Sequence, residues 1–160
     1  MFDPSTDEVG GNAILTVTFK TGNKIGTDGL ILIEFPLWNP NREFSSQEKH
    51  YFEGSVSCSS STNIDSDVSC SYSDSTQILT VENGLPSGVA ASTTVEFKID
   101  GFTNPISGKL VSGFVVYTAS SDGDYIDTAT TTLQVGTATD FESSSFTVAS
   151  SVDDDIAGVV

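Results

Sequence analysis

Apolar and polar side chains alternate along most of the chain with a period of two. Residues 15–19 alternate leucine, valine and phenylalanine with threonine, and residues 95–99 alternate valine, phenylalanine and isoleucine with Glu96 and Lys98. In an extended strand this period directs one row of side chains to a core and the other to water. Helical spacing of apolar residues is nearly absent, so the pattern predicts an all-β protein.

The same pattern predicts a series of short strands. They lie near residues 15–19, 31–35, 52–58, 68–72, 77–81, 95–99, 114–120, 126–135 and 145–149. Turn-forming pairs separate them, such as Asp28-Gly29, Asn83-Gly84 and Asp122-Gly123. Many short strands joined in this way are typical of a β-sandwich or a barrel. The long interval from Pro36 to Lys49 favours a crossing between sheets, so we expect an immunoglobulin-like two-sheet antiparallel β-sandwich.

Both ends of the chain carry a similar short motif. Residues 7–11 read Asp-Glu-Val-Gly-Gly, and residues 154–158 read Asp-Asp-Ile-Ala-Gly. The two motifs are 147 positions apart (154 minus 7) in a chain of 160 residues. This length is enough for one domain. We expect residues 1–150 to form a single β-sandwich module, and 151–160 to be either an acidic linker or the start of a following repeat. Chance similarity in a chain rich in aspartate and glycine is the alternative.

The charge of the chain limits its partners. It holds 22 acidic and 6 basic residues, which gives a formal net charge of -16. Because phosphate binding needs clustered lysine and arginine, we expect no nucleic-acid partner, and anionic membrane surfaces are disfavoured for the same reason. The acids either form a solubilising coat or are neutralised by divalent cations such as Ca²⁺.

Cys58 and Cys70 are the two cysteines of the chain. Neither has a nearby histidine or further cysteine to complete a zinc site, so we expect a disulfide between adjacent strands, with two free buried thiols as the alternative. A disulfide indicates an oxidising compartment, here extracellular or at the cell surface. No stretch approaches the roughly 20 apolar residues of a membrane span, so we expect no direct membrane insertion. We expect any secretion signal or anchor to lie outside this piece of sequence.

Several stretches also match a known pattern in their order and spacing. They are residues 35–40 (Phe-Pro-Leu-Trp-Asn-Pro), Cys58 and Cys70 with Ser71-Tyr72, residues 99–105 (Ile-Asp-Gly-Phe-Thr-Asn-Pro), 112–114 (Ser-Gly-Phe) and 125–127 (Tyr-Ile-Asp). Together they resemble the repeat modules of very large cell-surface proteins of ciliated protists. The resemblance spans about residues 19–135 and implies tandem extracellular β-sandwich modules. It supplies no catalytic residues.

Calcium is the most specific chemistry that the residues offer. Asp122, Asp124 and Asp127 place three carboxylates in one short segment, and Ca²⁺ takes about six to eight oxygen ligands. The alternative is an ordinary Asp-Gly hairpin turn with solvated acids. Asp154 and Asp155 form a second candidate, in which acids at a junction between modules share a cation.

Two aromatic residues could bind a sugar. Trp38 lies in a turn-rich stretch and Tyr51 follows it, and a flat ring can stack on a pyranose. The alternative is that the tryptophan fills the core of the sandwich.

We expect no enzyme. The single histidine, His50, follows Glu48 and Lys49, and no glycine-flanked nucleophile motif accompanies it. The sequence therefore predicts a structural or adhesive module of a repetitive surface or filament protein, whose partners are neighbouring modules of the same chain or like chains. A calcium- or carbohydrate-binding module is the alternative.

Overall fold

Two antiparallel sheets make up the part of the protein that the computed structural model describes, residues 1–36, 51–105 and 110–136. The strands are β1 (Phe2–Pro4), β2 (Asn12–Lys20), β3 (Leu30–Glu34), β4 (Phe52–Thr62), β5 (Ser69–Ser73), β6 (Ile78–Glu82), β7 (Thr94–Thr103), β8 (Val111–Ala119) and β9 (Tyr125–Leu133). These ranges contain no helix, which confirms the all-β prediction. It follows that no described segment is a helix able to cross a membrane.

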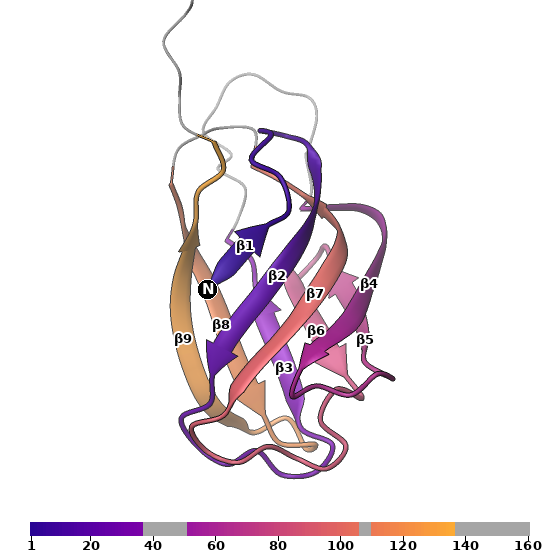
Figure 1. Ribbon diagram of the computed structural model, residues 1–160, viewed down its shortest axis with the longest axis vertical. Coiled ribbons are helices and arrows are strands. Elements are labelled where there is room, and N and C mark those ends of the chain that lie inside the picture. Colours follow the sequence, from indigo (N-terminus) through magenta and orange to yellow (C-terminus); the bar gives the residue numbers. More distant parts are fainter. Residues whose placement is uncertain (37–50, 106–109, 137–160) are drawn as a thin grey trace, which may run out of the picture.

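The strand order is that of an immunoglobulin-like sandwich. One sheet has the order β1-β2-β7-β4 and the other β5-β6-β3-β8-β9 (Figure 1). The first corresponds to the A-B-E-D sheet of immunoglobulin domains, and β3-β8-β9 corresponds to their C-F-G sheet. The hairpin β5–β6 extends the second sheet beyond β3. Because β3 and β4 belong to different sheets, the predicted crossing after Pro36 is confirmed.

Alternating burial follows the alternating sequence. In β2, Leu15 and Val17 are fully buried while Lys20 is exposed, and in β7 Phe97 and Ile99 are buried while Lys98 is exposed. β2 and β7 are hydrogen-bonded neighbours, with Val17 opposite Phe97. Period two therefore places both apolar rows on the same inner face of the sheet.

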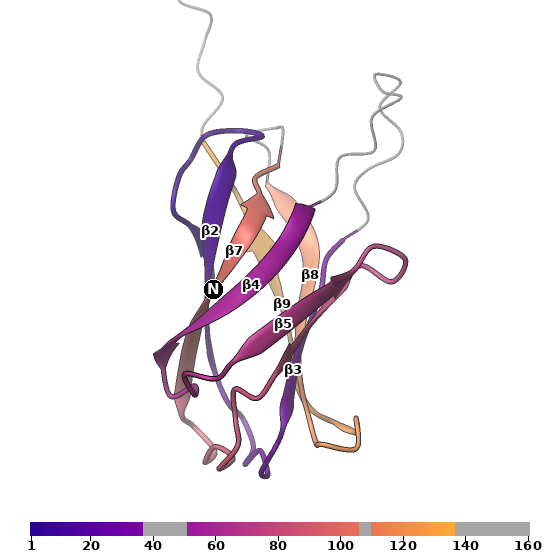
Figure 2. The same cartoon turned by 90° about the vertical axis from the view of Figure 1, so that its right-hand side faces the viewer.

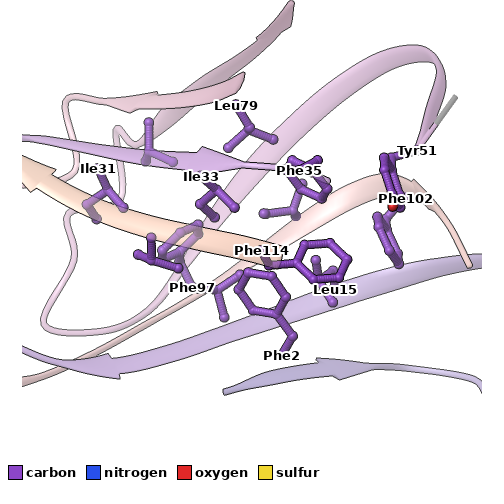
Figure 3. Close-up of a cluster of buried hydrophobic side chains, with 14 of the residues drawn as sticks. Phe2, Leu15, Ile31, Ile33, Phe35, Tyr51, Leu79, Phe97, Phe102 and Phe114 are labelled. Atoms are coloured by element: carbon purple, nitrogen blue, oxygen red, sulfur yellow. The ribbon is translucent and has the colours of Figure 1, made fainter. Parts of the chain in front are cut away.

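An aromatic cluster occupies the core at the end of the sandwich where β3 finishes (Figure 3). Phe35 lies at its centre, and its ring centroid is 5.1 to 6.3 Å from those of five other rings. These rings belong to Tyr51, Phe52, Tyr72, Phe102 and Phe114. Full burial of one such side chain contributes about 2 to 3 kcal/mol, so this cluster is a main source of stability.

Strand β1 could not be predicted from the alternation of apolar and polar residues. It has three residues and ends at Pro4, which is too short for a period of two to be visible. The strand is held because Phe2 is 7% exposed and its ring lies 5.2 Å from that of Phe114, edge to face.

Turn residues behave as the sequence predicts. Asp28 and Asn83 adopt left-handed backbone conformations, with φ of 58° and 59°. Such conformations are more accessible to aspartate and asparagine than to most residues. The predicted strand at 145–149 and the segment 151–160 lie outside the described residues.

Candidate functional site

The turn between β8 and β9 contains two of the three aspartates predicted to bind calcium. Asp122 and Asp124 are both exposed. Ser120 holds the turn together, because its N–H donates to the carbonyl of Asp124 at 2.9 Å and its carbonyl accepts from Gly123 at 3.0 Å. Gly123 has a φ of 89°, a conformation that favours glycine. This geometry is that of the hairpin turn stated above as the alternative.

The carboxylate of Asp127 binds a loop that is distant along the chain. It accepts hydrogen bonds from the backbone N–H groups of Gly22 at 3.0 Å and Asn23 at 3.1 Å. The side-chain amide of Asn23 donates a further bond of 2.7 Å. Partial burial by itself would raise the pKa of Asp127, but the donors of Asn23 and Gly22 outweigh it, and the pKa is lowered.

The three aspartates therefore do not form the predicted cluster. Within the described ranges there is no group of three or more histidine, cysteine, aspartate or glutamate side chains placed to hold a metal ion. The sequence placed Asp127 with Asp122 and Asp124 because they are close along the chain. The fold separates them in role, since the carboxylate of Asp127 meets the loop that follows β2, 105 positions away. Asp154 and Asp155 lie outside the described residues.

Tyr51 is a core residue, which corrects the suggestion that it faces a sugar. It is 2% exposed, and its ring stacks on Phe102 with a centroid distance of 6.1 Å (Figure 3). Burial raises the pKa of the Tyr51 hydroxyl far above its ordinary value, and the neighbouring Tyr72 raises it further. The ring is therefore covered by other aromatic side chains. Trp38 lies outside the described residues.

The predicted disulfide is confirmed, and it joins the two sheets. Cys58 lies on β4 and Cys70 on β5, with Cα atoms 5.5 Å apart. These strands follow each other along the chain but are edge strands of different sheets, seen side by side in Figure 2. The disulfide of antibody domains joins central strands of the two sheets, whereas this one closes an edge.

Asn104, in the stretch 99–105 that carries part of the resemblance, has a structural role that the sequence pattern did not predict. Its side chain is fully buried, and its amide donates to the carbonyls of Thr6 at 2.7 Å and Glu8 at 3.0 Å. It thereby fixes the loop between β1 and β2, which carries the acidic pair Asp7 and Glu8. A local sequence pattern could not predict these contacts, because the hydrogen-bond partners of Asn104 lie 96 and 98 positions away along the chain.

The outer faces of the two sheets differ in chemistry. On the five-stranded sheet Leu32 lies opposite Tyr117, and Tyr117 stacks on the exposed ring of Tyr125 at 4.7 Å. On the four-stranded sheet Glu96 accepts hydrogen bonds from Ser61 and Thr18, at 2.6 and 3.2 Å. The bonds from Ser61 and Thr18 lower the pKa of Glu96. The first face also carries a carboxylate, Glu34, which accepts a hydrogen bond of 3.0 Å from the hydroxyl of Tyr117.

Among the grooves on the described surface are the following two. One, of ≈ 380 Å³, lies between the β4–β5 and β6–β7 loops and is lined by residues that include Ile64, Asp65 and Pro86. The other, of ≈ 200 Å³, lies beside Asp127 and has Phe19 and Val116 in its lining.

Comparison with known proteins supports the fold and nothing finer. A crystal structure of an uncharacterized protein from Nocardia farcinica, described as having an immunoglobulin-like fold, superposes with a TM-score of 0.52. The match covers 86% of this chain and 97% of that chain at 15% sequence identity. The immunoglobulin-like sandwich is thus confirmed. No protein-family model matches the sequence, and no curated protein matches it.

Proposed function

We propose that this protein is an extracellular structural or adhesive module of a repetitive surface or filament protein, without catalysis, and that its partners are neighbouring modules of the same chain or like chains. The observation that carries the proposal is the disulfide between Cys58 and Cys70, which joins the two sheets of an immunoglobulin-like sandwich. Disulfides form and persist in oxidising compartments, and they are rare in cytosolic proteins.

The position of the disulfide supports a structural role. It closes the side of the sandwich where β4 and β5 face each other across the two sheets (Figure 2). A covalent bond at that side prevents the sheets from separating there. Resistance of this kind suits a module that bears load between neighbours.

The ends of the chain and its charge support a role in a larger assembly. The motif of residues 7–11 returns in similar form at 154–158, as expected of a chain that holds about one period of an array. The likeness of residues 35–40 and 99–105 to modules of protist surface proteins points in the same direction. A net charge of -16 keeps such a module soluble in a crowded extracellular layer.

The test is a chain of two tandem copies, studied by small-angle scattering and native mass spectrometry. A fixed contact between modules gives an elongated particle with one preferred end-to-end distance. Two modules that tumble independently over a broad range of distances would contradict the proposal.

A second test concerns the compartment. We expect the protein, recovered from its source, to lie outside the cell with Cys58 and Cys70 joined, as measured by mass spectrometry of peptides without prior reduction. Recovery from the cytosol with both thiols free would contradict the extracellular assignment.

A further inference from the structure

Strand β9 is an unusual edge. It is the last strand of the five-stranded sheet, and no described strand is hydrogen-bonded to its outer side. It has nine residues, and it pairs one to one with β8 from Asp127 to Thr131. It contains no proline, and residues 128–136 carry no charge.

The other three edges carry features that block strand pairing. β1 has three residues and ends in Pro4, and β5 has five residues. β4 breaks register twice against its neighbour β7. Shortness, proline and bulges are the means by which soluble proteins prevent edge-to-edge association. β9 is nine residues long and has no proline, and its two register shifts against β8 lie near its ends, before Asp127 and between Thr131 and Thr132.

We propose that β9 pairs with β9 of a second copy of this chain, antiparallel, about a two-fold axis at Thr130. The pairing would join the two five-stranded sheets into one. The inference deepens the proposed function, on which it rests for the expectation that like modules meet.

The sequence of β9 suits pairing with itself. Thr128, Thr130 and Thr132 are exposed and lie on the outer face, opposite Tyr117, Val115 and Ser112 of β8. An axis at Thr130 sets Thr128 of one copy against Thr132 of the other, and Thr130 against itself. Directly opposed threonines form favourable cross-strand pairs. The outward-facing threonines of the two copies therefore lie opposite one another in this register, without any shift of the strands.

The distribution of charge favours contact between two copies at β9 over contact at other parts of their surfaces. Each chain carries a net charge of -16, so most approaches of two copies are repulsive. Along residues 128–133 there is no charge to repel. Asp127, at the end of this segment, is opposite Leu133 of the second copy in the proposed register, and its carboxylate is occupied by Gly22 and Asn23. The two aspartates do not meet.

The experiment measures the oligomeric state of the full chain by sedimentation up to about 1 mM. We expect a monomer–dimer equilibrium that strengthens when salt is raised, because salt screens the repulsion between acidic copies. Thr130→Lys places two like charges opposite each other and should raise the dissociation constant at least about tenfold. Thr62→Lys, an exposed threonine on edge strand β4, is the matched control and should leave it within about threefold.

Charge complementation separates the inference from misfolding. Thr130→Glu alone should also weaken the dimer, whereas an equal mixture with Thr130→Lys should restore it as a heterodimer, detected by native mass spectrometry. A mixture that stays monomeric, or equal effects of Thr130→Lys and Thr62→Lys, would overturn pairing at β9 while leaving association of modules in place. A wild-type chain that is monomeric at every concentration would overturn the inference itself. The two-copy chain described above then still tests the proposed function.

Discussion

The two sheets are held together in different ways at the two edges of the sandwich. Where β4 faces β5, the disulfide between Cys58 and Cys70 joins the sheets covalently. Where β1 faces β9 (Figure 1), closure depends on the ring of Phe2 against Phe114, and on Asp127, whose carboxylate binds the loop after β2.

This difference shows how stability is distributed in the molecule. The disulfide is a covalent link between β4 and β5, so this side stays joined at Cys58 and Cys70 even when local contacts break. Its contribution to the free energy of unfolding comes mainly from restricting the unfolded chain. The β1–β9 side depends on contacts that open one at a time. We therefore expect local opening, and contact with other copies, to occur on the β1–β9 side.

Removal of the disulfide should have the largest effect. Cys58→Ala combined with Cys70→Ala should lower the free energy of unfolding by about 3 kcal/mol, because the bond closes a short loop of 12 positions. Denaturant titration measures the change, with the oxidised and reduced wild-type protein as a second comparison. Equal stability of the oxidised and reduced forms would show that the two sides are not held differently.

The next largest effect concerns Phe2. Phe2→Ala should cost about 2 kcal/mol, less than in a closed core, because β1 can detach and let water in. Phe2→Leu keeps most of the apolar volume and is the control, expected to cost less than about 1.5 kcal/mol. Hydrogen exchange should show faster exchange of the β2 amides that bond to β1. If β7 and β8 amides accelerate equally, the β1–β9 side does not open locally.

Loss of the Asp127 carboxylate should have a smaller effect. Asp127→Ala removes the acceptor for Gly22 and Asn23 and should cost about 1 kcal/mol, a modest value because these bonds are exposed to solvent. Asp124→Ala removes the same charge from the neighbouring turn, and its effect should stay within about 0.5 kcal/mol. Thermal unfolding of both variants measures these two changes in stability. Equal changes would mean that Asp127 acts only through net charge.

Lowering the pH should have the smallest effect on the stability that Asp127 contributes. The pKa of Asp127 is lower in the folded state than the value near 3.9 of an unfolded chain. Its contribution is therefore complete above that value and is lost as the pH falls through the lower folded pKa. The difference in stability between wild type and Asp127→Ala should shrink as the pH falls below about 4. Comparing variants cancels the general relief of acidic repulsion, and a pH-independent difference would contradict the carboxylate's role.

The local features of the fold follow from sequence. Residues 15–19 and 95–99 form strands because alternation of side chains is a property of neighbouring residues. Asp28 and Asn83 form turns because their own side chains tolerate the left-handed conformation. The two cysteines pair because each offers the other a partner.

Only the tertiary structure decided the roles of residues whose partners are distant along the chain. Asp127 binds a loop 104 and 105 positions away, and the ring of Tyr51, just before β4, stacks on Phe102 of the neighbouring strand β7. The short β1 exists because β2 and Phe114 accept it. An edge such as β9 is likewise defined by which strands fail to cover it. Periodicity reports which side of a strand is buried, but the identity of the neighbour depends on the chain closing into two sheets.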